Sequence, residues 1–188
     1  MYDYESDNRP WESYEDKIKT VVIEDGVTTI GENSFYDCEK IINILIPDSV
    51  MSIGKAAFRH CEALESINIP DGITQISDNA FSGCLGLTEI IIPDSVTKLG
   101  INAFYNCDGL TEIIIPDNVI EIDEKAFYGC DGLTEIIIPN SVKTIGDYAF
   151  EFCRVLEYVS FGTGLTTIGT YAFANCNFKN ILIPSNIT

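Results

Sequence analysis

Cysteine recurs at a fixed interval of 23 residues through almost the whole of this 188-residue chain. The seven cysteines occupy positions 38, 61, 84, 107, 130, 153 and 176, and a phenylalanine lies three residues before each of them. An Ile-Gly pair and an Ala-Phe pair recur at constant offsets, for example at 145–146 and 149–150. A constant period of this length indicates stacked structural repeats, so the repeat determines the fold class.

Each unit predicts one short strand followed by a turn and a compact return. In the unit 87–109, Ile90 and Ile92 alternate with Ile91, which is the period-two pattern of a strand. Pro93 cannot donate a hydrogen bond to a strand ladder and is expected to end the strand, and Asp-Ser turn residues follow it. An extended return then leads to a bend at Gly100 and leaves room for about one helical turn. One unit cannot bury its apolar positions alone, so neighbouring units must stack.

The pattern Leu-x-x-Ile-x-Ile-Pro-x-x-Val-x-x-Ile-Gly-x-x-Ala-Phe-x-x-Cys resembles the BspA-like (treponemal-type) class of leucine-rich repeat. The resemblance covers residues 18–188 as seven repeats and a partial eighth, and the seventh unit is one residue short because Phe178 follows Cys176 by two positions instead of three. Residues 1–17, with Pro10, Trp11 and Tyr14, resemble the N-terminal capping segment of the family. The resemblance implies a right-handed, β-rich leucine-rich-repeat solenoid. It would have a parallel concave sheet of about eight short strands, with short turns or single helical turns on the convex side.

The seven cysteines are expected to form a ladder of buried free thiols. Equivalent residues on adjacent turns lie about 4.8 Å apart, but their Cα–Cβ bonds run parallel, so their Cβ atoms stay farther apart than in a disulfide. A disulfide framework and a metal site are the alternatives, but no Cys-x-x-Cys motif or His pair accompanies the thiols. No metal or cofactor is therefore predicted.

Outward positions of the strands are the candidate protein-binding surface. The central column contains three consecutive isoleucines, and the column two residues earlier contains three glutamates. The candidate binding residues are Ile91, Ile114, Ile137, Glu89, Glu112, Glu135 and Tyr158. An apolar stripe beside a row of like charges favours a partner with apolar and cationic groups. Repeat duplication explains the same identities without selection for binding, and the sequence leaves both interpretations open.

Other polar residues have simpler interpretations. The aspartates Asp25, Asp48, Asp71, Asp94 and Asp117 follow the strands, where they could collect Ca²⁺ or form turns; Asn, Thr and Ser at the same position in other units favour turns. His60 precedes Cys61, but neighbouring residues in a turn point in different directions. We therefore expect a solvated histidine on the convex side instead of a Cys/His dyad. The sequence predicts no enzymatic activity.

The formal net charge of −18 argues against binding to nucleic acid, and apolar runs of no more than five residues argue against membrane insertion. The first residues lack the pattern of a signal peptide. The resemblance implies a surface or secreted, adhesion-type repeat protein that binds a protein or peptide partner. The alternative is a structural spacer or self-assembling segment of a longer surface protein, with end-to-end self-association.

Overall fold

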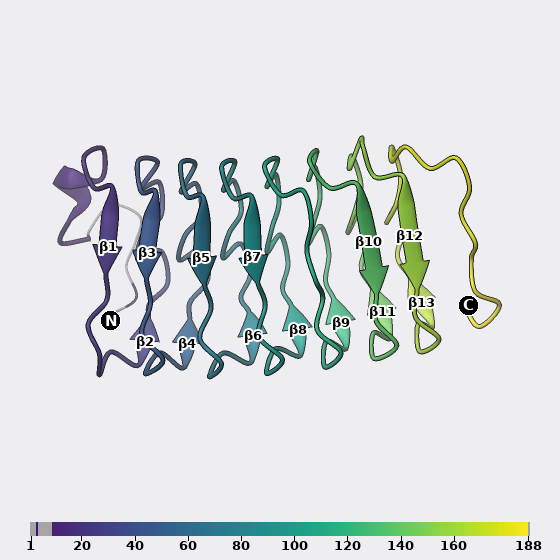
Figure 1. The fold of residues 1–188 in the computed structure, drawn as a ribbon, viewed down its shortest axis with the longest axis horizontal. Helices are drawn as coiled ribbons and strands as arrows, with labels where there is room; N and C mark the ends of the chain where they lie inside the picture. Colours follow the sequence, from purple (N-terminus) through teal and green to yellow (C-terminus); the bar gives the residue numbers. More distant parts are fainter. Residues whose placement is uncertain (1–2, 4–8, 188) are drawn as a thin grey trace.

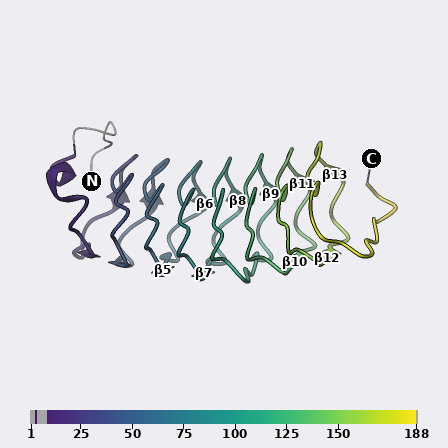
Figure 2. The same ribbon diagram turned by 90° about the horizontal axis from the view of Figure 1, so that it is seen from above.

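The fold is a stack of repeat turns, and the structure, a computed structural model, describes residues 3 and 9–187. Four strands form one parallel sheet in the order β1 (Thr20–Val22), β3 (Asn43–Leu45), β5 (Ser66–Asn68) and β7 (Glu89–Ile91). Farther along the stack, β10 (Glu135–Ile138) pairs in parallel with β12 (Tyr158–Phe161). Figures 1 and 2 show these strands on one side of an almost straight row of turns. We call this surface the strand face.

A second set of two-residue strands runs along the return side of the stack. β2 (Thr29–Ile30) pairs with β4 (Ser52–Ile53). A five-stranded parallel sheet contains β6 (Gln75–Ile76), β8 (Lys98–Leu99), β9 (Glu121–Ile122), β11 (Thr144–Ile145) and β13 (Thr167–Ile168). Helical structure in the described part of the chain is limited to the 3-10 helix η1 (Glu12–Tyr14). The solenoid with an extended return and short turns is therefore confirmed.

The strand face has fewer regular strands than the repeat pattern predicts. Within the described residues, six segments form strands there, two short of the expected eight, because 112–114 and 180–182 join no ladder. The stretch 112–115 still keeps its inward side chains, Ile113 and Ile115, buried. The interruption at 112–114 separates the sheet that ends at β7 from the pair β10–β12. Regular pairing is thus lost in the middle of the strand face while the core continues through it.

The core is a continuous column of aromatic rings and thiols between the two sets of strands. Phe35, Phe58, Phe81, Phe104, Phe127, Phe150 and Phe173 stack with centroid separations of 5.0–5.6 Å and interplanar angles of 2–13°. The predicted core positions of the unit 87–109 are all buried, among them Leu87, Leu99 and Cys107 with no exposed surface. Each repeat therefore buries its apolar side chains against the repeats before and after it.

The first turn is covered by the N-terminal segment. Trp11 stacks on Phe35 with a centroid separation of 5.3 Å and donates its indole N–H to the carbonyl of Ser34. Arg9 is 4% exposed, donates to the carbonyl of Tyr36, and pairs with the carboxylate of Glu15. Tyr14, in contrast, is exposed. Trp11 thus packs on the first ring of the core column, and Arg9, which the sequence did not single out, lies buried beside it.

The convex turns depend on left-handed backbone conformations. At one repeated position, Asn33, Ala56 and Asn79 have φ between 51° and 57°. This conformation directs the N–H groups of Asn33 and Ala56 to the carbonyls of Lys55 and Asp78 on the following turn. Asparagine tolerates the left-handed region better than alanine does, because its short polar side chain compensates part of the steric cost. Ala56 is therefore a strained member of this column.

Replacing Ala56 by asparagine is expected to stabilise the protein. Ala56→Asn should raise the free energy of unfolding by about 1 kcal/mol, because it relieves part of the left-handed cost at that position. Urea unfolding of the variant and the parent measures the difference. Ala63→Asn is the matched control in the same repeat, since Ala63 has no positive φ. An equal gain from both substitutions would contradict the backbone explanation.

Candidate functional site: the strand face and its groove

Alternation within the short strands exposes the predicted apolar column. In β7 the central residue Ile90 is buried and Ile91 is 80% exposed; Ile114 is 83% and Ile137 62% exposed. Pairing places Asn68 beside Ile91 and Ser160 beside Ile137, as the repeat register requires. The three isoleucines therefore project from the strand face. Side chains of this size with so much exposed surface are candidates for partner contact.

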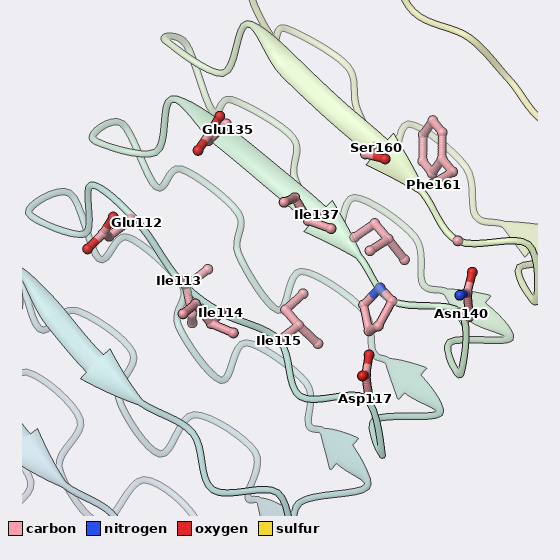
Figure 3. A pocket seen from close by; sticks show the side chains of 13 residues that line it. Glu112, Ile113, Ile114, Ile115, Asp117, Glu135, Ile137, Asn140, Ser160 and Phe161 are labelled. Carbon is pink, nitrogen blue, oxygen red and sulfur yellow. The ribbon is translucent and has the colours of Figure 1, made fainter.

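A groove of about 560 Å³ crosses the strand face next to the interruption at 112–114. Figure 3 shows Ile114 and Ile137 projecting from adjacent turns, with Glu112 and Glu135 towards the start of the same segments. All four line the groove, together with Ser160, Phe161 and Gly162 from the next turn. The structure thus brings four of the seven predicted site residues into one hollow.

The other three predicted residues lie outside this groove. Glu89 and Ile91 belong to β7, on the far side of the 112–114 segment, and do not line it. Tyr158 lies at the start of β12 and lines a neighbouring groove at the C-terminal end of the stack. The candidate site is therefore centred between 112–115 and β12, not spread evenly along the isoleucine column.

The glutamates of the groove carry no internal counter-charge. Ion pairs of the described residues join several other carboxylates to lysine or arginine, but none involves Glu112 or Glu135. Both residues are exposed and lie at equivalent positions of successive turns. Like charges at this separation repel one another. A cationic group from outside would relieve that repulsion.

Phe161 and Gly162 also line the groove, although the sequence did not predict them as site residues. Phe161 is half-buried, and its ring meets Phe173 edge-on at 5.5 Å. Gly162 replaces the proline found after most strands and brings the turn close to Pro139; a Cβ there would lie 2.3 Å from the Pro139 carbonyl oxygen. The departures from the repeat at 160–162 were the available signal. They indicate that this turn differs from the duplicated units.

Comparison with known proteins identifies the family. The family model described as "BspA type Leucine rich repeat region" matches residues 13–134 and 74–188, with six copies. The chain belongs to the BspA-type leucine-rich repeat family. Membership in this repeat family indicates a protein-interaction module. No curated protein matches the chain.

Solved leucine-rich repeat structures share this fold. A leucine-rich repeat protein from Bacteroides ovatus is 31% identical, with a TM-score of 0.70 over 90% of this chain and 52% of its own. The Treponema pallidum leucine-rich repeat protein is 33% identical, with a TM-score of 0.73 over 80% of this chain and 72% of its own. A leucine-rich cell surface protein from Faecalibacterium prausnitzii is 25% identical, with a TM-score of 0.60 over 90% of this chain and 62% of its own. The chain therefore spans about half the length of the Bacteroides protein.

The BspA-type cysteines form the predicted free-thiol ladder. All seven are free, six are buried, and Cys176 is half-buried. The thiols of Cys61, Cys84 and Cys107 donate to the carbonyls of Phe35, Phe58 and Phe81 at 3.1–3.2 Å, and the later repeats continue the pattern. Burial raises the pKa of these thiols well above the ordinary value, and the neighbouring cysteine raises it further. The ladder is structural packing, not a row of nucleophiles.

His60 lies partly buried on the convex side of the stack. His60 is half-buried, with its ring edge-on to Tyr36 at 6.0 Å, so the expectation of a solvated side chain is corrected. The neighbouring thiol of Cys61 donates to the carbonyl of Phe35 in the core and does not pair with His60.

The five post-strand aspartates are exposed, and no cluster of three His, Cys, Asp or Glu side chains within the described residues could hold a metal ion. No described helix is long and apolar enough to cross a membrane.

Proposed function

We propose that this protein is a non-enzymatic binding module that takes a protein or peptide partner along the groove of the strand face. The observation that supports this is the convergence of Ile114, Ile137 and two unpaired glutamates on one hollow of about 560 Å³. The same hollow is lined by residues that depart from the duplicated pattern, namely Ser160, Phe161 and Gly162. Their presence there favours a selected binding site over an inherited repeat consensus. Ile91, Glu89 and Tyr158 would extend the contact at either side.

The groove favours an extended segment that combines apolar and cationic side chains. Glu135 and Ile137 are two residues apart in β10 and face the same side, so about 6.7 Å separates them along the strand. A partner strand with lysine or arginine two residues from an aliphatic or aromatic side chain would match both. The charged contact would weaken with added salt, whereas the apolar contact would persist.

Substituting the centre of the groove is expected to abolish binding. Ile114→Glu removes the apolar contact at the centre of the groove and sets a carboxylate where the peptide's apolar side chain would lie, so affinity for a basic-apolar peptide should fall by at least about tenfold. The melting curve should stay nearly unchanged, because Ile114 is 83% exposed. Fluorescence anisotropy with labelled extended peptides bearing Lys-x-Leu or Lys-x-Phe spacing, against versions with Glu for Lys, measures the effect.

The matched control is Ile120→Glu, since Ile120 is 51% exposed just before β9 on the return side. This variant should bind as the parent does. Full retention of peptide binding by folded Ile114→Glu, or equal binding of the Lys and Glu peptides, would refute the proposed site.

A surface or secreted location and a role in adhesion belong to the same proposal. The Faecalibacterium protein, 25% identical, is described as a cell surface protein, which supports this location. Residues 1–17 would cap the repeat domain 18–188, which the packing of Trp11 and Arg9 on the first turn supports. Antibody labelling of intact cells of the source organism tests the location, and labelling that requires permeabilised cells would contradict it.

A structural or self-assembling role is the second candidate. The C-terminal end of the stack supports it, because Ile181, Leu182 and Ile183 leave between 41% and 86% of their surface exposed. Such a segment would join copies of the chain end to end, as part of a longer surface protein.

A further inference from the structure

Side chains at one repeated convex position form a column of planar groups that is broken at Ser82. This position is occupied in successive turns by Tyr36, Arg59, Ser82, Tyr105 and Tyr128. The guanidinium of Arg59 lies over the Tyr36 ring, 5.6 Å from its centroid. Tyr105 and Tyr128 stack at 4.9 Å with an interplanar angle of 5°. Ser82 adds no planar group between these two pairs, so the column has a gap one turn wide.

A pocket of about 230 Å³ lies at this gap, and we call it the Ser82 pocket. Arg59 and His60 line it from the turn before, and Tyr105 and Asn106 line it from the turn after. Adjacent turns repeat about every 4.8 Å, so two turns leave room for one ring at stacking distance from both Arg59 and Tyr105. The volume is below the range of about 300–1,000 Å³ that is typical of small-molecule sites. The pocket therefore suits a single ring and its substituent.

Arg59 brings a positive charge to this pocket that no carboxylate of the described residues neutralises. The other two arginines, Arg9 and Arg154, each pair with a carboxylate, whereas none of the ion pairs between described residues involves Arg59. Its Nε is buried without a hydrogen-bond partner in the same part of the chain. The described lining contains no aspartate or glutamate, although the chain has a formal net charge of −18. Because a guanidinium stays charged and binds carboxylates through paired hydrogen bonds, the lining favours an anionic ligand.

The next pocket along the convex side has the opposite character. It shares Tyr105 and Asn106 with the Ser82 pocket, but it is lined by Asp108 and Asp131. Arg154 also lines it, and its guanidinium is already paired with Asp131. An anion there would be repelled by Asp108. The preference for an anion is therefore specific to the Ser82 pocket.

We propose that the Ser82 pocket binds one aromatic ring that carries a carboxylate. The ring fills the gap in the column and stacks on Tyr105, as Tyr128 does on its other side. The carboxylate accepts hydrogen bonds from the guanidinium of Arg59, and His60 supplies a second donor. A free aromatic acid and the C-terminal aromatic residue of a polypeptide both offer this chemistry. The pocket shares no lining residue with the strand-face groove, so this site is separate from peptide binding there.

Isothermal titration calorimetry of the full chain with 3-phenylpropionate tests the site. We expect a dissociation constant of about 1 mM or below, as suits a ligand of this size. Propionate, which lacks the ring, and 3-phenyl-1-propanol, which lacks the charge, should each bind at least about tenfold more weakly. The peptide Gly-Gly-Phe, compared with its C-terminal amide, separates the two sources. Binding of the free-carboxylate peptide as well would place polypeptide C-termini among the ligands, and binding of 3-phenylpropionate alone would restrict the site to small aromatic acids.

The discriminating variant is Ser82→Tyr, which fills the gap with the residue that the next two turns carry at this position. It should fold as the parent does and weaken 3-phenylpropionate binding at least about tenfold. The matched control is Ser66→Tyr, at an exposed position of β5 where β12 carries Tyr158, and it should bind fully.

Arg59→Gln removes the charge without filling the pocket, so it should also weaken binding at least about tenfold and tests the site if Ser82→Tyr fails to fold. Ile114→Glu should bind 3-phenylpropionate as the parent does, because it changes only the strand-face groove. No binding of 3-phenylpropionate, equal binding of 3-phenyl-1-propanol, or full binding by folded Ser82→Tyr or Arg59→Gln would each overturn the proposal.

Discussion

Between pH 9 and pH 10 the free energy of unfolding is expected to fall by at least about 5 kcal/mol, because five deeply buried thiols ionise only in the unfolded chain and each contributes about 1 kcal/mol. These are Cys61, Cys84, Cys107, Cys130 and Cys153, whose pKa values burial raises well above the ordinary value near 9. Well below the ordinary thiol pKa both states keep these thiols protonated, and they leave stability unaffected. As the pH rises through that pKa, the unfolded state alone is stabilised by losing these protons. Stability is therefore lost as pH rises.

Urea unfolding at pH 8, 9 and 10 under reducing conditions measures this slope. The double variant Cys107→Ser with Cys130→Ser keeps a hydroxyl donor for the Phe81 and Phe104 carbonyls but removes two of the five titrating groups. Its stability at pH 8 is expected to be lower, and its loss between pH 9 and pH 10 should be smaller than the parent's by about 2 kcal/mol, about 1 kcal/mol for each thiol removed. An unchanged slope would show that the thiol ladder does not control alkaline stability.

Phe104→Ala is expected to lower the free energy of unfolding by about 4 kcal/mol. The Phe104 ring has no exposed surface and stacks between Phe81 at 5.6 Å and Phe127 at 5.2 Å. Its removal leaves a cavity in the middle of the stack, where each repeat depends on its neighbours. Unfolding monitored by circular dichroism and by tyrosine fluorescence should also lose coincidence, because the repeats on the two sides become uncoupled.

The control is the same substitution at the end of the column. Phe173 stacks on Phe150 at 5.0 Å but is half-buried, so Phe173→Ala should cost about half as much. Equal losses at the two positions would mean that stacking across the centre adds nothing to cooperativity.

Much of the fold could be predicted because the repeat imposes the same constraints on every turn. Spacing of Phe104 and Cys107 placed both in the core, and alternation placed Ile90 inside and Ile91 outside. The left-handed residues of the convex turns were not predicted, since Tyr148 and Phe152, with φ of 60° and 61°, belong to residue types that rarely adopt this region. Hydrogen bonds between turns impose that conformation, and such bonds exist only once the repeats are stacked.

The candidate site was predicted only in part. Exposure of Ile114, Ile137, Glu112 and Glu135 follows from their register, so the sequence was sufficient to propose them. The groove that joins them was not visible, because it depends on the lost pairing at 112–114 and on the close approach of Gly162 to Pro139. Each of these features occurs at one place in the stack and does not recur every 23 residues, so the repeat pattern cannot predict it.

The 23-residue period by itself determined the family, the stacked architecture, the buried thiol ladder and the outward columns of the strand face. Only the tertiary structure decided where those columns form a groove, how Arg9 closes the first turn, and that Ile181 and Ile183 lie uncovered at the other end. The physical reason is that periodic features repeat the same local contacts in every turn. Breaks in the stack arise from packing between particular turns, which no single repeat encodes.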